Sequence, residues 1–214
     1  MLKKLLLFFL LLIVGAYGVL DVAAKRMAEQ KLAERAEASA GGQAEATADV
    51  DSFPFVLKLL ARGSAGDISI HVTDVTASQL EFTSVDLDLR GVKLDKGKLL
   101  ADRRPEVTDI DTGTLTIRIA AAAISKALRG LPVTISDGRV EVEVAGQVRT
   151  ADVTLAAGGA LRIGVPRGPS VTVQVPRTAL GSCDATALNV DNDMIRLSCT
   201  MTEIPPALLA AAQR

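Results

Sequence analysis

Five stretches of the chain alternate strictly between aliphatic and polar residues, and this pattern limits the possible folds more than any other feature. The alternation runs through residues 67–73, 85–90, 114–119, 139–144 and 171–175. Successive side chains of a β-strand point to opposite faces, so each stretch predicts a strand with one buried and one solvated face. Such strands are typical of antiparallel sheets.

Short helices interrupt this predicted sheet. Residues 53–63 form an apolar segment with Pro54 near its start and Gly63 at its end, and residues 120–128 form a second, which Gly130 ends. Proline near the first turn and glycine after the last turn favour a helix between them. A third helix is expected after the Pro205-Pro206 pair. The pattern therefore predicts an α+β fold that is mostly antiparallel sheet.

Composition excludes some classes of function. The 24 Lys and Arg residues balance the 25 Asp and Glu residues, so the chain has no general attraction to nucleic acid. Tryptophan is absent, and the aromatic residues beyond position 24 are Phe53, Phe55 and Phe82, too few for a platform that stacks bases. The 49% of apolar residues still supply enough aliphatic surface for a core.

The N-terminal segment predicts export. Lys3 and Lys4 precede sixteen uncharged residues, Leu5 to Leu20. We favour a retained signal-anchor over residues 1–24, because this span would cross a hydrocarbon core of roughly 30 Å and is longer than a typical signal-peptide core. A cleaved signal peptide ending near Val22-Ala23-Ala24 is the alternative. Both interpretations place residues 25–214 on the outer, periplasmic or envelope side of the cytoplasmic membrane.

The segment that follows predicts a stalk. Residues 25–38 are rich in charges and alanine, as in a solvated helix, and Ser39 to Asp51 are rich in Ala, Gly and Thr without large apolar residues. We therefore interpret residues 25–52 as a helical stalk and flexible linker, and residues 53–214 as the folded domain.

The two cysteines predict a disulfide. Cys183 and Cys199 would lie in an oxidising compartment, where an isolated pair is normally bridged. Residues 189–193 are turn-forming and are followed by alternating residues, so the pair would close a hairpin. A metal site would need more ligands than these two cysteines and the distant His71.

No catalytic pattern stands out. His71 is the single histidine, and it lies among the polar positions of a predicted strand. The carboxylate pairs Asp86/Asp88 and Glu141/Glu143 also occupy polar strand positions, where solvated faces explain them. We find no nucleophile elbow and no glycine-rich phosphate loop, and we expect no enzyme activity and no cofactor.

A cationic segment separates two predicted strands, and its positive charge could contact lipid headgroups beside a membrane. An ordinary solvated loop is the alternative. The candidate headgroup contacts are Lys93, Lys96, Lys98, Arg103 and Arg104.

Several of these features together resemble those of a known protein family. The N-terminal anchor, the Phe53-Pro54-Phe55 start of a Leu-rich helix, and the strands at residues 68–72 and 85–92 resemble the LmeA-type phospholipid-binding family of actinobacterial cell envelopes. The strand and helix at residues 113–128 and the cysteine before a terminal hairpin are also similar. The resemblance covers roughly residues 50–202.

The resemblance implies a fold similar to one half of bactericidal/permeability-increasing protein, in which a curved antiparallel sheet cradles a helix beside an apolar groove for acyl chains. We therefore expect an exported, membrane-tethered phospholipid-binding protein, a carrier or transfer protein, whose partners are phospholipid and membrane and not nucleic acid. A non-enzymatic envelope adaptor or structural protein that binds another protein is the alternative. The residues expected to line the groove, each of which plain core packing would also explain, are Phe53, Phe55, Leu57, Leu60 and Phe82.

Overall fold

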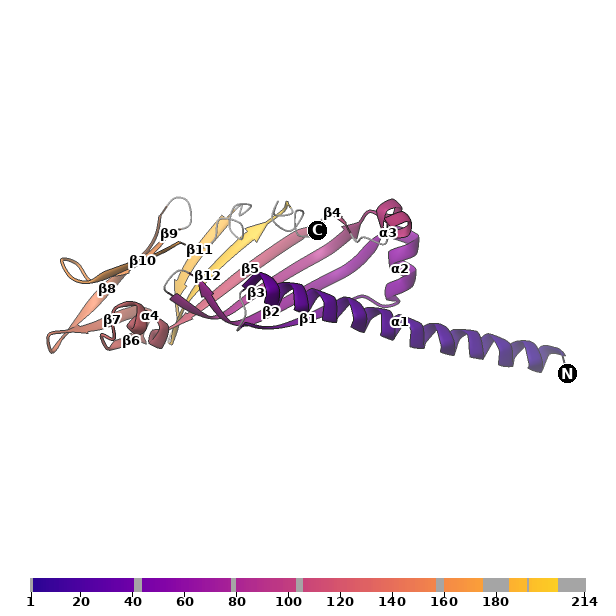
Figure 1. Ribbon diagram of the computed structural model, residues 1–214, viewed down its shortest axis with the longest axis horizontal. Coiled ribbons are helices and arrows are strands. Elements are labelled where there is room, and N and C mark those ends of the chain that lie inside the picture. Colours follow the sequence, from indigo (N-terminus) through magenta and orange to yellow (C-terminus); the bar gives the residue numbers. More distant parts are fainter. Residues whose placement is uncertain are drawn as a thin grey trace.

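The computed structural model describes residues 2–40, 44–77, 80–102, 106–156, 160–174, 185–191 and 193–203, and it describes the side chains of the first helix from Tyr17 onward. Within these residues the chain forms two antiparallel sheets with helices at their ends and along one edge (Figure 1). The helices are α1 (Leu2–Ala40), α2 (Phe55–Arg62), α3 (Lys96–Asp102) and α4 (Ala121–Ala127).

The larger sheet has the strand order β1-β2-β3-β5-β12-β11, with β4 paired to β3. Its strands are β1 (Glu45–Asp51), β2 (Ser64–Ala77), β3 (Leu80–Leu94), β4 (Val107–Asp109), β5 (Thr112–Ala120), β11 (Ala185–Val190) and β12 (Met194–Met201). The smaller sheet, in the order β10-β9-β8-β7-β6, consists of β6 (Val133–Ser136), β7 (Arg139–Val144), β8 (Gln147–Ala156), β9 (Ala160–Gly164) and β10 (Ser170–Gln174). The antiparallel α+β prediction is confirmed, because all of these pairings are antiparallel.

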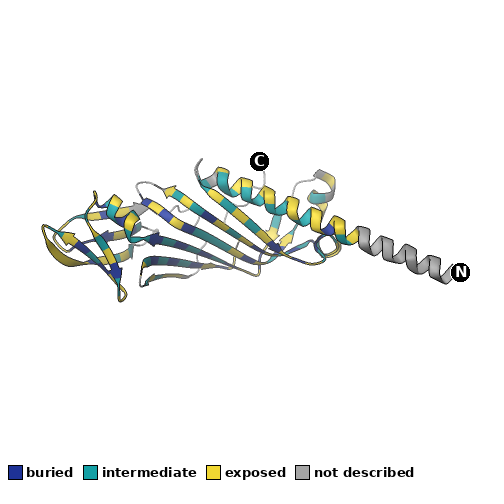
Figure 2. Cartoon of the chain, turned by 90° about the horizontal axis from the view of Figure 1, so that it is seen from below, coloured by how far each residue is buried: buried dark blue, intermediate teal, exposed yellow. Residues whose placement is uncertain are grey.

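The buried core covers the apolar face of the larger sheet and extends into the smaller sheet, where Val142 and Ile163 belong to it. Register places Val72, Val85, Ile117 and Leu197 opposite one another across β2, β3, β5 and β12. Ile117 and Leu197 in the centre of the sheet are buried. The alternation in the sequence thus becomes one aliphatic face and one polar face, and Figure 2 shows the accompanying change between buried and more exposed residues along the strands.

The structure corrects the linker prediction for residues 45–51. These residues form strand β1, which pairs with β2 over its whole length. Its side chains alternate, with Ala46, Ala48 and Val50 on the more buried side. The small size of the alanines concealed this alternation in the sequence, because the segment lacks the branched and aromatic residues that usually mark a strand.

Helix α1 packs against the sheet and does not stand apart as a stalk. The helix predicted over residues 25–38 is part of α1, and Ala24, Ala28 and Leu32 pack against the core from its inner side. Figures 1 and 2 show the C-terminal half of α1 lying along the β1 edge of the larger sheet. Its small residues allow this close approach, so the charges of α1 occupy the outer side.

Two glutamates of α1 cover the free edge of β1. An Oε1 atom of Glu37 accepts the backbone N–H of Ala46 at 3.1 Å, and an Oε1 atom of Glu29 accepts that of Val50 at 3.1 Å. Lys25 lies 3.4 Å from Glu29 and 3.6 Å from Asp49, measured between side-chain N and O atoms. An unpaired strand edge is a template for another strand, and these carboxylates protect it.

A third acid of α1 caps helix α2. Asp21 is 3% exposed, and its two carboxylate oxygens accept the backbone N–H groups of Phe55 at 2.9 Å and Val56 at 2.7 Å. The residue at the N-cap position of α2 is Pro54, whose side chain makes no capping bond. Asp21 therefore supplies from another helix what a local Ser or Asp usually supplies.

Two expectations about α1 and the sheet lack support here. Among the described residues, no helix carries an apolar stretch that meets the length and hydropathy needed to span a bilayer. The sheet is not shown to curve around a helix, since the main contacts of α1 are with β1, β2 and α2 at one edge. The helix expected after Pro205 lies outside the described residues.

Candidate functional site

The five residues expected to line one groove do not lie together. Phe55 and Phe82 are 6% and 2% exposed in the core, whereas Phe53, Leu57 and Leu60 are 73%, 54% and 51% exposed on and beside α2. Phe82 pairs with Val75 near the start of β3, a strand that contacts α4, and Figure 1 shows α4 and α2 at opposite ends of the larger sheet. The structure therefore separates two core residues from three surface residues.

The expected headgroup cations are partly neutralised by neighbouring groups. Lys93 Nζ lies 2.8 Å from Asp109 Oδ2 and 3.5 Å from Asp111 Oδ1, and Lys98 Nζ lies 2.5 Å from Glu106 Oε2. These acids come from the segment that contains β4 and returns beside β3. Lys96 Nζ instead donates to the carbonyl oxygen of Ala61, near the C-terminus of α2, at 3.1 Å. Arg103 and Arg104 lie outside the described residues.

The Lys93–Asp109 pair predicts a pH dependence with a definite sign. The hydrogen bond with Asp109, and then its charge, raises the pKa of Lys93 above 10.5. The hydrogen bond from Lys93, and then its charge, lowers the pKa of Asp109 below 3.8. The stabilisation by Asp109 is thus fully present above pH 3.8 and is lost as the pH falls through its lowered pKa. The stabilisation by Lys93 is fully present below pH 10.5 and is lost as the pH rises through its raised pKa.

We expect the stability difference between the unmodified chain and an Asp109→Asn variant to be largest between these limits. Thermal unfolding across the pH range measures it, and both groups are exposed, so the difference is small. A Lys93→Met variant should show the same profile, and a difference that grows at acid pH would contradict the assignment.

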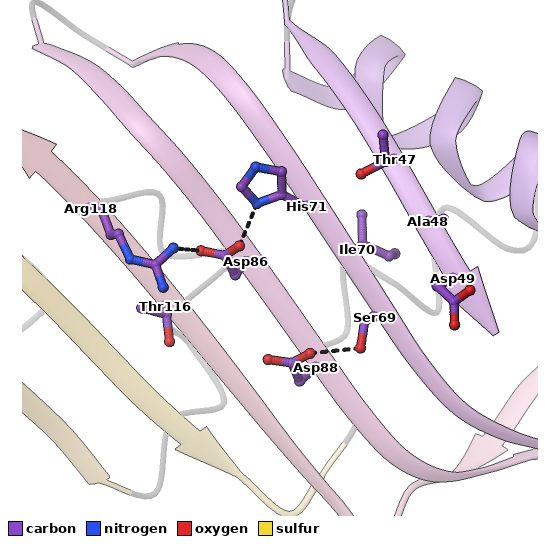
Figure 3. A pocket seen from close by; sticks show the side chains of 10 residues that line it. All are labelled: Thr47, Ala48, Asp49, Ser69, Ile70, His71, Asp86, Asp88, Thr116 and Arg118. Carbon is purple, nitrogen blue, oxygen red and sulfur yellow. Dashed lines mark hydrogen bonds and ion pairs between the residues drawn. The ribbon is translucent and has the colours of Figure 1, made fainter. Parts of the chain in front are cut away.

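A polar pocket lies on the opposite face of the larger sheet. Register aligns Thr47 of β1, His71 of β2, Asp86 of β3 and Thr116 of β5 in one row across four strands. The pocket has a volume of about 330 Å³, and Figure 3 shows these side chains together with its other lining residues, Ala48, Asp49, Ser69, Ile70, Asp88 and Arg118. The polar residues of β2, β3 and β5 in this pocket occupy polar positions of the alternating pattern, whereas those of β1 belong to a strand that the sequence did not reveal.

The polar groups of this pocket are bound to one another. His71 Nδ1 lies 2.5 Å from Asp86 Oδ1, and Arg118 also contacts Asp86 and donates to Ser84 Oγ at 3.0 Å. Ser69 Oγ donates to Asp88 Oδ1 at 2.7 Å (Figure 3). The serine hydroxyl and the imidazole are thus engaged by different carboxylates. They do not form the nucleophile–base pair that covalent catalysis requires.

The apolar face offers a different kind of surface. Three aliphatic residues near its centre, Ile70, Val85 and Leu87, are only partly buried although they pack against the core. Ile70 and Leu87 are directly paired between β2 and β3. The residues expected from the sequence to line the groove, three phenylalanines and two leucines, do not include these three. The signal that could have found them is the alternation itself, which assigns them to the apolar face.

The described residues hold no group of three or more His, Cys, Asp or Glu side chains arranged to bind a metal ion. Cys199 is buried on β12, within the β11–β12 hairpin that the sequence predicts. Cys183 lies outside the described residues, so the disulfide stays a prediction.

A comparison with models of protein families identifies the family of this chain. The model of LmeA-like phospholipid-binding proteins matches residues 19–199, which include strands of both sheets and the half of α1 that packs on the larger sheet. The chain belongs to the LmeA-like phospholipid-binding family. The resemblance inferred from sequence is thereby confirmed. A search of curated proteins and a search of solved structures each found no significant match.

The LmeA-like match begins at residue 19, two residues before the Asp21 that caps α2. The contact between α1 and α2 therefore lies within the matched region. The family description names phospholipid binding and no catalytic activity, so lipid binding is the function that the match supports.

Proposed function

We propose that the chain is a membrane-tethered phospholipid carrier of the cell envelope, which holds acyl chains against the apolar face of its larger sheet. The observation that carries the proposal is the LmeA-like match over residues 19–199. Activity as a carrier needs only a reversible apolar site, and no cofactor takes part.

The apolar face has the chemistry that acyl chains need. Its partly buried centre at Ile70, Val85 and Leu87 is purely aliphatic and continues into the buried pair Ile68 and Leu89. Each methylene group that moves from water onto such a surface contributes about 0.8 kcal/mol. The pocket of the polar face is a poor acyl site, since Asp49, Asp86 and Asp88 line it.

The N-terminal segment supports tethering. Lys3 and Lys4 precede the uncharged run Leu5–Leu20, and α1 continues from this run into the helix that packs on the sheet. Basic residues before an apolar run favour retention of the N-terminus on the cytoplasmic side. Residues 25–214 would then lie on the outer side, in the oxidising compartment where a Cys183–Cys199 disulfide forms.

Native mass spectrometry of the full chain, purified in mild detergent from cells that export it, tests the proposal. We expect a mass excess equal to one or two phospholipids, which lipid extraction then identifies. Leu87→Ser should bind less lipid, because it places a hydroxyl at the centre of the apolar face.

The matched control is Val148→Ser, at a residue of β8 in the smaller sheet that is 65% exposed. It should keep the bound lipid, and the thermal unfolding of both variants checks that they fold. A full chain that carries no lipid after purification, and none after incubation with phospholipid vesicles, would favour the adaptor alternative.

A further inference from the structure

Helix α2 is apolar on both of its sides. Phe55 faces the core, and Val56 and Leu59 pack against it. The outer side presents Leu57 and Leu60, each more than half exposed. Leu57 and Leu60 are three residues apart on this outer side, and Phe53, which precedes the helix, is also exposed. A short surface helix whose outer face is apolar indicates a partner that is itself apolar.

A second exposed apolar region lies beside this helix. Tyr17, Val19, Leu20 and Val22 of α1 are exposed. The bonds from Asp21 to the first N–H groups of α2 fix these residues next to α2. We call the two exposed regions, residues 17–22 and 53–62, the α1–α2 corner. The buried Asp21 carboxylate joins the two regions, since it accepts the N–H groups of Phe55 and Val56.

The charge of the corner selects the chemistry of the partner. Residues 53–62 contain Lys58 and Arg62 and no acidic residue. Lys96 adds a third cation at the C-terminus of α2, where its ammonium donates to Ala61. Exposed leucines and phenylalanine with flanking cations are typical of helices that lie in the interface of an anionic bilayer. Each cation near such a surface adds to the attraction.

We propose that the α1–α2 corner docks on the surface of an anionic phospholipid bilayer, with α2 in the headgroup region. Figure 1 shows α2 running across the direction of α1, at the end of the sheet from which the N-terminal half of α1 extends. The uncharged run Leu5–Leu20 leads directly into the corner, which makes the surface continuous with the most apolar segment of the chain. Docking would hold the sheet close to its lipid source, and in this sense the inference extends the proposed carrier function.

The absence of tryptophan makes a direct test possible. A Phe53→Trp variant of the full chain carries one tryptophan on the corner. We expect its emission to shift to shorter wavelength when the chain is reconstituted in vesicles of phosphatidylcholine and phosphatidylglycerol. Phospholipids brominated close to the headgroup should quench it. Adding Leu57→Ser and Leu60→Ser should lower the fraction of quenched tryptophan, since these leucines hold α2 in the interface; the expected change in the docking equilibrium is on the order of tenfold.

The matched control is Val148→Trp, which places the probe on an exposed residue of the smaller sheet, far from α2. Its emission should stay that of a solvated indole in the same vesicles. Emission of the Phe53→Trp variant that is unchanged and unquenched by vesicles would overturn the proposal. A blue shift that is equally large in detergent and in vesicles, together with no quenching by the brominated phospholipids, would also overturn it, because another part of the chain or a second copy would then cover the corner.

Two further measurements separate this inference from the carrier function. Quenching that falls with added salt supports an anionic surface, and equal quenching in pure phosphatidylcholine overturns the electrostatic part. Native mass spectra of the serine variants show whether they still hold lipid. A chain that docks but carries no lipid keeps the docking surface and refutes the carrier. A chain that carries lipid but does not dock supports the carrier function and refutes the docking surface.

Discussion

Replacing Asp21 by alanine is expected to destabilise the domain by about 2–4 kcal/mol. The substitution leaves the N–H groups of Phe55 and Val56 without an acceptor at a site where Asp21 is almost fully buried. Pro54 cannot replace it, because its side chain forms no capping bond. A negative charge at a helix N-terminus also interacts favourably with the helix dipole, and this contribution is lost as well.

Thermal unfolding of the full chain in detergent, followed by circular dichroism, measures the effect. For a domain of this size the midpoint should fall by roughly 5–15 °C. An Asp21→Asn variant serves as the control, since the amide oxygen still accepts one N–H group while the charge is removed. It should lie between the unmodified chain and Asp21→Ala. Equal midpoints for all three chains would mean that α2 does not depend on this cap.

The second large effect is expected for Gly66→Ala, in the irregular part of β2. Gly66 has a φ of +83°, and a Cβ atom there would come within 2.7 Å of the carbonyl oxygen of Asp51 and 2.8 Å of the Cβ atom of Ser52. The left-handed conformation costs a side chain about 1–2 kcal/mol. The overlap with a paired strand costs a further 1–3 kcal/mol, because β1 must move to relieve it.

The chain offers a matched control for this glycine. Gly130, after α4, has a φ of +82°, and a Cβ atom there would meet nothing within 4 Å. Gly130→Ala therefore reports the cost of the backbone conformation alone, and chemical denaturation of both variants yields the cost of the overlap as their difference. Equal losses of stability in Gly66→Ala and Gly130→Ala would show that residues 51 and 52, between β1 and α2, can move away from the new Cβ atom at no cost.

The sheet could be predicted from the sequence, whereas the role of α1 could not. Strict alternation determines which face of each strand is buried, so β2, β3, β5, β7 and β10 were found from local pattern. Strand β1 was missed because alanine at alternate positions carries little strand preference. The packing of α1 depends on Glu29, Glu37 and Asp21 reaching backbone groups at least nine residues away in the chain, and no local pattern encodes such contacts.

The candidate sites, too, depend on contacts between distant segments that the sequence does not reveal. Phe53, Phe55, Leu57 and Leu60 all read as apolar, but which of them face the core is decided by where α2 meets β2 and α1. The cations at residues 93–98 are apparent in the sequence. The acids that pair with them come from residues 106–111, in and beside β4, and this pairing is not apparent. The polar row at Thr47, His71, Asp86 and Thr116 required the register of four strands, which alternation alone leaves open.

The glutamates along α1 also make this helix a safeguard against self-association. If α1 were cut or pulled away from the sheet, the N–H groups of Ala46 and Val50 would lose their acceptors. The uncovered edge would then be able to recruit a strand from a second molecule, and growth from such edges leads to insoluble assemblies. Proteolytic loss of the N-terminal helix would therefore convert a protected sheet edge into a seed for aggregation.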